Sequence, residues 1–200
     1  MFGPKRFVQA CTIVLALAGI EPVLAAAGDE SPEDDPAAAL AAGQELYLSA
    51  GGYGCLVCHG QVAHGAGQVG GMIRGATLAQ FQTSLEQVPV MALLAPSLSM
   101  TDRLNIVEYL NYLGDLPLVS LTYRDGHWQA QTQVLQVGQW AQLVLYNDSF
   151  ETQSLDLAEL GLATLAVLPL ATLDILWRPT SASFALAGVA PIQAMPLDLR

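Results

Sequence analysis

Residues 55–59 of this 200-residue chain read Cys-Leu-Val-Cys-His, and no other stretch narrows the chemistry of the chain as much. Cys55 and Cys58 are close enough in sequence for both thiols to reach one edge of a porphyrin and form thioethers with its vinyl groups. His59 follows directly, so its ring can turn beneath the porphyrin toward the iron. The run therefore predicts covalent attachment of one haem c, with His59 as the proximal iron ligand.

A Cys-x-x-Cys pair also occurs in dithiol redox centres and in zinc sites. Of the three cysteines in this chain, Cys11 lies in a segment that is typical of an export signal. The remainder offers no second cysteine pair, and its only other histidines are His64 and His127. These counts favour haem attachment over zinc binding or a disulfide.

The first 27 residues are typical of a secretory signal peptide. Lys5 and Arg6 precede an apolar run over residues 7–20, and small residues at 25–27 supply a cleavage site. A cleaved signal is favoured over a retained anchor, because about fourteen apolar residues reach only roughly 21 Å as a helix, short of the ~30 Å bilayer core. We expect export to the periplasm, followed by an acidic, proline-containing linker over residues 28–36 that does not order itself.

The chain is strongly acidic. Removing residues 1–27 takes away Lys5, Arg6 and Glu21 and changes the formal net charge from −11 to −12, leaving no lysine. Such a charge disfavours nucleic acid and anionic lipid as partners, and it favours a redox partner protein with a basic docking face. The alternative, that the acidity serves only solubility, stays open.

Residues 37–116 carry the signals of three short amphipathic helices. The predicted helices are Ala37–Ala50, with Asp35 as cap and Pro36 at the first position; a helix from Thr77 to Pro89; and a helix from the capping box of Ser99 and Asp102 to Gly114. The haem motif lies between the first two.

This segment resembles a small bacterial class I cytochrome c. The matching residues are Gly43 to Tyr47, the Cys-x-x-Cys-His-Gly run, Ile73 to Gly75, and Leu98-Ser99 leading into a helix that ends Glu-Tyr-Leu. The resemblance implies a small all-α haem domain in which the first and last helices cross, with Gly43, Tyr47 and Tyr109 at the contact.

The resemblance also implies a sixth iron ligand on the opposite side of the haem from His59. Among the methionines, Met91 is favoured over Met100, because Met91 falls in an irregular stretch between the second and third helices whereas Met100 lies inside a capping box. Met72 follows His59 too soon to cross the haem easily; Met195 and, as an outsider, His64 are the other candidates.

Three further residues near the motif have expected roles. The carbonyl of Gly71 is expected to accept the ring N–H of His59. Arg74 is a candidate partner for a haem propionate, with an ordinary surface arginine as the alternative. His64, in a glycine-rich loop, is expected to be exposed to solvent.

From residue 117 to residue 200 the helical period gives way to short alternating runs, which predict an all-β sandwich or small barrel. The expected strands are Leu118–Tyr123, Gln133–Val137, Gln139–Tyr146, Gln153–Leu157, Thr172–Trp177 and Ser183–Leu186. The apolar stretch from Leu160 to Trp177 is expected to form buried strands and not a membrane span. Part of this apolar surface is expected to be an interface, either with the haem domain or with another subunit.

Residues 134–148 and 168–177 resemble the corresponding parts of a cupredoxin. The segment has no cysteine, and Gln153 stands where the resemblance places the first copper-binding histidine. A mononuclear copper site needs two histidines and a cysteine, so we expect a cupredoxin-like domain without copper.

The sequence thus predicts an α domain followed by a β domain in an exported mono-haem cytochrome that transfers single electrons. It would act as a free carrier or, with the C-terminal domain as a contact, as a subunit of a larger redox complex. Two alternatives remain: a five-coordinate haem enzyme or gas sensor, and a structural haem subunit of an assembly. An electron-transfer protein is favoured over an enzyme.

Overall fold

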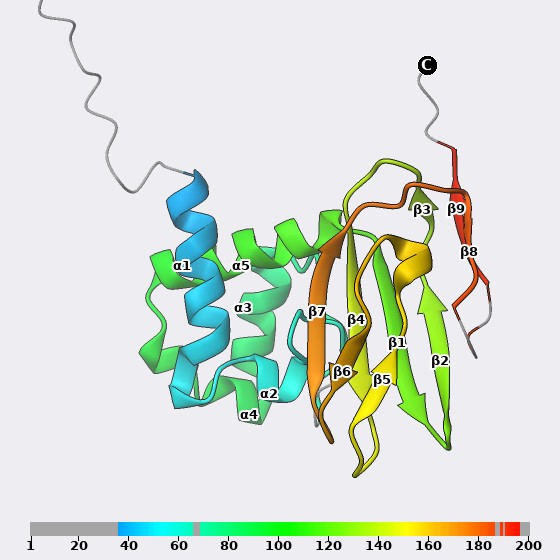
Figure 1. Cartoon of the computed structure of the whole chain (residues 1–200). Helices are drawn as coiled ribbons and strands as arrows, with labels where there is room; N and C mark the ends of the chain where they lie inside the picture. Colours follow the sequence, from blue (N-terminus) through cyan, green and yellow to red (C-terminus); the bar gives the residue numbers. More distant parts are fainter. Residues whose placement is uncertain (1–35, 66–68, 187–188, 190, 197–200) are drawn as a thin grey trace, which may run out of the picture. The chain divides into compact units, whose positions relative to one another are not determined.

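A computed structural model describes residues 36–65, 69–186, 189 and 191–196 (Figure 1). The predicted signal peptide, Cys11, most of the acidic linker and the cap at Asp35 lie outside these residues. The described chain is helical over residues 36–115 and forms β-strands over residues 118–195, which confirms the expected order of an α part followed by a β part. None of its helices has the length and apolar character needed to cross a membrane.

The helical part contains three longer helices and two single turns of α-helix. These are α1 (Pro36–Ser49), α2 (Leu56–His59), α3 (Leu78–Gln87), α4 (Pro89–Ala92) and α5 (Met100–Asp115). Short 3₁₀ turns at Ala50–Gly52 and Ala95–Ser97 follow α1 and precede α5.

Helices α1 and α5 cross at a point where neither backbone leaves room for an extra atom. A Cβ on Gly43 of α1 would lie 1.9 Å from the carbonyl oxygen of Asn105 in α5. The rings of Tyr47 and Tyr109 pack beside this contact with their centroids 5.5 Å apart, and the Tyr47 hydroxyl donates to the carbonyl of Gly60 at 2.6 Å. The predicted crossing at Gly43, Tyr47 and Tyr109 is confirmed.

Two helices begin with the expected capping signals. Ser99 Oγ accepts from the backbone N–H of Asp102 at 3.1 Å, and Asp102 returns a carboxylate bond to the Ser99 N–H at 2.8 Å. Thr77 caps α3 through a similar exchange with Gln80. Pro89 ends the run of α3 as expected but also begins α4, so Met91 lies in a helical turn and not in an irregular stretch. Proline is well suited to the first helical position because its missing N–H has no partner there.

The described residues of the β part form nine strands. They are β1 (Leu118–Arg124), β2 (His127–Thr132), β3 (Leu135–Gln136), β4 (Ala141–Asn147), β5 (Gln153–Leu155), β6 (Leu165–Val167), β7 (Thr172–Trp177), β8 (Ser183–Phe184) and β9 (Ile192–Met195). A four-stranded sheet has the order β2-β1-β4-β7, a three-stranded sheet the order β3-β9-β8, and β5 pairs with β6. Within the four-stranded sheet β1 and β4 run parallel and the other neighbours antiparallel.

The six expected strands are present, several of them shorter than predicted. Strands β2, β6 and β9 were not predicted. Strand β2 reads His-Trp-Gln-Ala-Gln-Thr and is mostly exposed, so it lacks the apolar alternation that marks a strand in a sequence. Strand β2 forms because it pairs with β1, and the pattern of its own side chains does not predict that pairing.

Two hydrophobic cores fill the described part of the chain. The β core draws buried side chains from strands of all three sheets, among them Leu143, Val167 and Ile192. Trp177 of β7 is buried in it, whereas Leu173 and Ile175 are only partly buried against it. Leu168, Leu170 and Leu176 are 48–63% exposed, so the expectation that Leu160–Trp177 forms buried strands is confirmed only in part. The helical core includes Leu118 of β1 and Val144 of β4 as buried members. Part of the apolar surface of the β region is therefore covered by the helices, which agrees with one of the two expected interfaces.

Candidate functional site

The Cys-x-x-Cys-His run folds into the single turn of α2 directly beside the end of α1. Gly54 precedes it at φ +71°, and a Cβ there would lie 2.4 Å from the carbonyl oxygen of Leu48. The N–H of Cys55 donates to the carbonyl of Tyr47 at 2.7 Å, and the N–H of His59 donates to the carbonyl of Cys55 at 2.9 Å. The glycine allows this close approach, and the turn brings both cysteines and the histidine to one place.

Both cysteines carry free thiols. Cys55 is buried, and this burial raises the pKa of its thiol to about 11, so the sulfur is protonated at neutral pH. Cys58 is only half-buried. Neither sulfur is used in a disulfide, so both are available to form covalent bonds to a bound group.

The ring of His59 is held in one orientation by the loop that follows it. Its Nδ1 lies 2.9 Å from the carbonyl oxygen of Gly71, which is the expected contact. A carbonyl only accepts, so Nδ1 carries the proton and Nε2 keeps a free lone pair for a metal. Gly70 makes the approach possible, because a Cβ at this position would lie 2.6 Å from His59 Nδ1.

A cavity of about 460 Å³ and a smaller one of about 90 Å³ adjoin this histidine. Both are lined by His59, Val69, Gly70, Val88 and Met91, and the smaller is also lined by Cys55 and Cys58. The smaller cavity is thus bordered by two thiols, an imidazole and a thioether, and the imidazole and the thioether also border the larger one. This donor set is the one that attaches and ligates a haem c, so the residues present fit that group.

The structure separates the candidate methionines by position. Met91 lines both cavities. Met100 is 52% exposed at the start of α5, where its sulfur lies 3.7 Å from the amide nitrogen of Gln82, and it lines neither cavity. Met72 is 53% exposed at the edge of the larger cavity, and Met195 lies in β9. Only Met91 shares both cavities with His59.

Arg74 holds the end of the last helix. Its Nη1 donates to the carbonyl of Val62 at 3.1 Å, and its Nη2 donates to the carbonyls of Leu113 and Leu116. Burial lowers the pKa of Arg74 to about 10, which leaves it charged at neutral pH. Both terminal nitrogens bond to main-chain oxygens, which gives Arg74 a structural position, while the residue also lines the larger cavity beside His59. The propionate contact stays a prediction.

The prediction that His64 is exposed is wrong. The side chain is only 8% exposed, and neither ring nitrogen has a hydrogen-bond partner. Burial is the main cause that lowers its pKa to about 4, and the nearby charge of Arg74 adds to the effect. His64 is therefore a neutral imidazole at pH 7. The hydrophilic, glycine-rich loop suggested exposure, but the residues that cover it are distant in sequence.

Several residues of the cavity wall were not identified from the sequence. Val69, Gly70 and Val88 line both cavities, while Phe81 and Leu110 line the larger one. The adjacent glycines at 70 and 71 were the available signal, because a backbone that must pass close to a ring favours glycine. The apolar residues carry no such signal and are typical of any helix core.

In the β part, His127 and Gln153 lie on different strands. His127 is exposed in β2 and its ring contacts Gln129 at 3.2 Å, whereas Gln153 begins β5. Among the described residues no three His, Cys, Asp or Glu side chains are grouped as metal ligands.

Comparison with models of known protein families and with curated proteins found no match for this chain. The assignment of function therefore rests on the motif and on the geometry of the cavity.

Proposed function

We propose that residues 37–116 form a class I c-type cytochrome domain of an exported, periplasmic protein that transfers single electrons. One haem would be bound covalently by Cys55 and Cys58, with His59 and Met91 as axial ligands. The observation that supports this most strongly is that Cys55, Cys58, His59 and Met91 line one cavity, with Nδ1 of His59 held by the carbonyl of Gly71.

A haem with histidine and methionine ligands supplies a one-electron centre of raised reduction potential with both axial positions filled. The chain supplies its attachment, its orientation and its surroundings. Gly71 holds the His59 ring through Nδ1, while Phe81 and Leu110 contribute apolar side chains to the wall of the larger cavity.

The partner would contact the cavity at an apolar rim, which we define as Tyr53, Val69, Val88 and Val90. These side chains line the smaller cavity and are 41–78% exposed. Residues 50–73 and 87–101, which surround it, contain no Asp, Glu, Lys or Arg. We propose that the acidic residues outside the rim steer a partner with a basic face, and that the rim makes the close contact.

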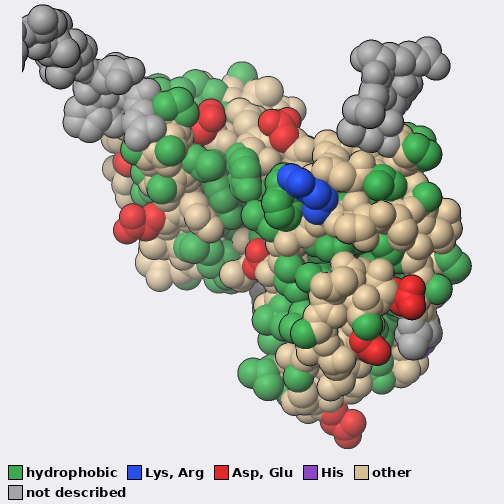
Figure 2. Space-filling model, turned by 45° about the horizontal axis from the view of Figure 1, so that its top comes forward, with side chains coloured by type: hydrophobic (Ala, Val, Ile, Leu, Met, Phe, Trp, Pro, Cys, Tyr) green, Lys and Arg blue, Asp and Glu red, His purple; other side chains and the backbone are tan. Residues whose placement is uncertain are grey.

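For residues 117–200 we propose a cupredoxin-like sandwich without copper that serves as a scaffold or as a contact to a larger redox complex. Its support is a single core shared by strands of three sheets, as a sandwich requires. Hydrophobic side chains are exposed at many places on the face in Figure 2, whereas acidic side chains are scattered among them.

The axial ligand provides the sharpest test. We expect the exported full-length protein to retain one haem after extraction with acidified acetone and to show the methionine-to-iron charge-transfer band when oxidised. Met91→Leu should abolish the band but keep the covalent haem. Met100→Leu is the matched control and should keep both, because Met100 lies outside the cavities.

The alternatives give different results. A high-spin spectrum and rapid carbon monoxide binding in the unaltered protein would support a five-coordinate haem enzyme or sensor. Haem that is bound but exchanges electrons with no redox partner would favour a structural role. Colourless protein of unmodified mass would contradict haem attachment altogether.

A further inference from the structure

A second cleft, of about 560 Å³, lies between the loop around His64 and one face of the four-stranded sheet. It does not include His59, Met91 or either cysteine of the motif. Its size falls within the range of small-molecule sites. Met72 lines both this cleft and the larger cavity beside His59, so the cleft is a candidate ligand site next to the haem cavity.

The floor of this cleft is a patch of polar side chains on neighbouring strands. Ser120, Thr122 and Arg124 alternate along β1 and so point to the same face of the sheet. Gln131 of β2 is paired with Ser120, while Gln129 of β2 and Tyr146 of β4 are paired with Thr122. Hydroxyl and amide groups thus converge on a space that water or a polar ligand must fill.

The wall opposite the floor contains His64. This side chain is more than nine-tenths buried, and both of its ring nitrogens lack a partner in the structure. An unpaired buried polar group is costly, and such groups in native proteins call for a missing partner. As a neutral imidazole, His64 offers one N–H donor and one acceptor, but both nitrogens are shielded from the cleft as the ring stands, so a turn of the ring is needed before either can bond to a molecule there.

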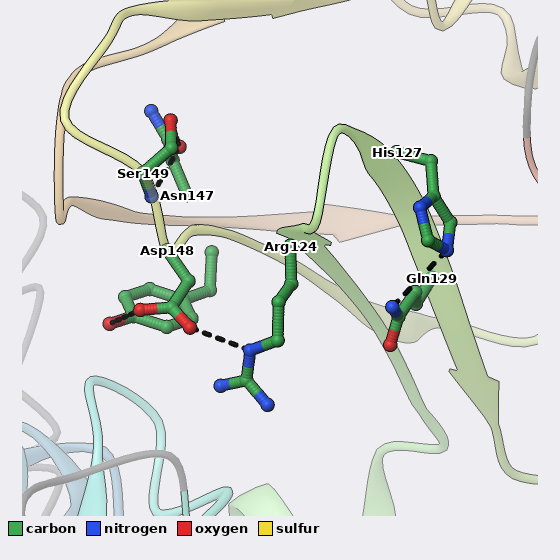
Figure 3. A network of polar contacts seen from close by, with 7 residues as sticks. Arg124, His127, Gln129, Asn147, Asp148 and Ser149 are labelled. Atoms are coloured by element: carbon green, nitrogen blue, oxygen red, sulfur yellow. Dashed lines mark hydrogen bonds and ion pairs between the residues drawn. The ribbon is translucent and has the colours of Figure 1, made fainter.

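The charged residues that line the cleft indicate the class of ligand that it would bind. Its lining contains one arginine and no carboxylate, in a chain of net charge −11. Figure 3 shows the Nε of Arg124 directed at Asp148, which it contacts at 2.6 Å from outside the lining. No hydrogen bond is recorded for the two Nη atoms of Arg124 among the described residues, so this pair of donors is available.

We propose that this cleft binds a small molecule bearing an oxyanion group, either a carboxylate or a phosphate. The Nη atoms of Arg124 would bond the two oxygens in parallel, as guanidinium groups do with planar anions. The hydroxyl and amide groups of the sheet would complete the contacts, and the ring N–H of His64 would donate from the opposite wall.

Titration calorimetry of the exported full-length protein at pH 7 tests this site, with inorganic phosphate, succinate and sucrose as probes. We expect at least one of the two anions to bind at one equivalent and sucrose not to bind. Binding of phosphate alone identifies a phosphoryl ligand, and binding of succinate alone identifies a carboxylate. Because no haem ligand lines the cleft, the result is independent of whether the haem proposal holds.

Arg124→Gln should weaken anion binding by about tenfold or more, because it removes charge-assisted bonds at an exposed position. His64→Leu should weaken it as well. Arg178→Gln removes an arginine that stacks on Trp140 outside the cleft and should leave the affinity unchanged. Absence of binding by both anions, equal binding of sucrose, or unchanged affinity in Arg124→Gln would overturn the proposal.

Discussion

Burial of the His64 imidazole costs free energy that no hydrogen bond in the structure offsets. A buried imidazole without partners costs about 1–3 kcal/mol for each unsatisfied group. The protein keeps its ring neutral by lowering the pKa to about 4. This residue therefore makes the stability of the folded chain sensitive to acid.

We expect the free energy of unfolding to fall as the pH is lowered from 6.5 to 4. In this window the unfolded chain binds a proton at His64 that the folded chain excludes, because the folded pKa of about 4 is below the ordinary value of 6.5. The loss should approach about 3 kcal/mol. Urea denaturation at several pH values measures it.

The His64→Leu variant is the control for this pH dependence. It should lack the component that is lost between pH 6.5 and 4, and at pH 7 it should be more stable than the unaltered protein by about 1–3 kcal/mol, since no polar group is left unpaired. Identical pH profiles for the two proteins would show that His64 is solvated.

Gly43 is the residue whose replacement should damage the helical core most directly. We expect Gly43→Ala to lower the free energy of unfolding by about 3 kcal/mol, because its Cβ would overlap the Asn105 carbonyl and force α1 away from α5. Gly71→Ala is the matched control, since a Cβ there has no atom within 4 Å. Equal effects of the two changes would show that the helices can separate freely.

At the scale of the elements, the described residues between α2 and α3, 60–65 and 69–77, are held by backbone hydrogen bonds to neighbouring segments. Gly65 and Gly70 donate to the carbonyls of His59 and Cys58 at 2.8 and 2.7 Å, and Gly75 donates to the carbonyl of Leu110 at 2.7 Å. These bonds tie the loop both to the haem motif and to α5. The positions at which α5 begins and ends therefore affect how the loop is held.

The start of α5 depends on Ser99. We expect Ser99→Ala to lower the free energy of unfolding by about 1 kcal/mol, because it removes the acceptor for the N–H of Asp102. Thr101→Ala, an exposed change in the same turn, should have little effect. Thermal or urea denaturation followed by circular dichroism compares them, and equal losses would mean that the cap does not stabilise the helix.

At the scale of the whole described chain, the helices and the sheet share a core. Val144 and Leu118 of the sheet are buried within the helical cluster, and Arg74 bonds to the carbonyl of Leu116 just before β1. Residues 31–200 form one compact unit. The two parts should therefore unfold together.

This coupling can be measured because all three tryptophans, at 128, 140 and 177, lie in the β part. Fluorescence therefore reports the strands, and ellipticity at 222 nm reports mainly the helices. Val144→Ala should lower the free energy of unfolding by about 2 kcal/mol in both signals, because it leaves a cavity between the two parts. Val134→Ala, at a 67% exposed site, is the control. A shift in one signal alone would show independent domains.

The local signals in this sequence were sufficient for the longer helices and for the capping box of Ser99 and Asp102, because each depends on residues within one or two turns or on a periodicity that a single segment carries by itself. The crossing at Gly43 was implied by the resemblance to a class I cytochrome c, and it joins helices that are far apart in the chain. Strands β2 and β9 escaped prediction because their order comes from partners: β9 pairs with β3, almost sixty residues earlier in the chain.

The sequence alone determined which chemistry the motif can perform and where the α part gives way to strands, since bonding capacity and periodicity belong to the residues themselves. Tertiary structure decided that Met91 and not Met100 shares the cavities with His59, that Arg74 caps a helix, and that His64 is buried beside a polar cleft. Each of these depends on contacts between segments far apart in the chain, which form only when the helices and the sheet pack together.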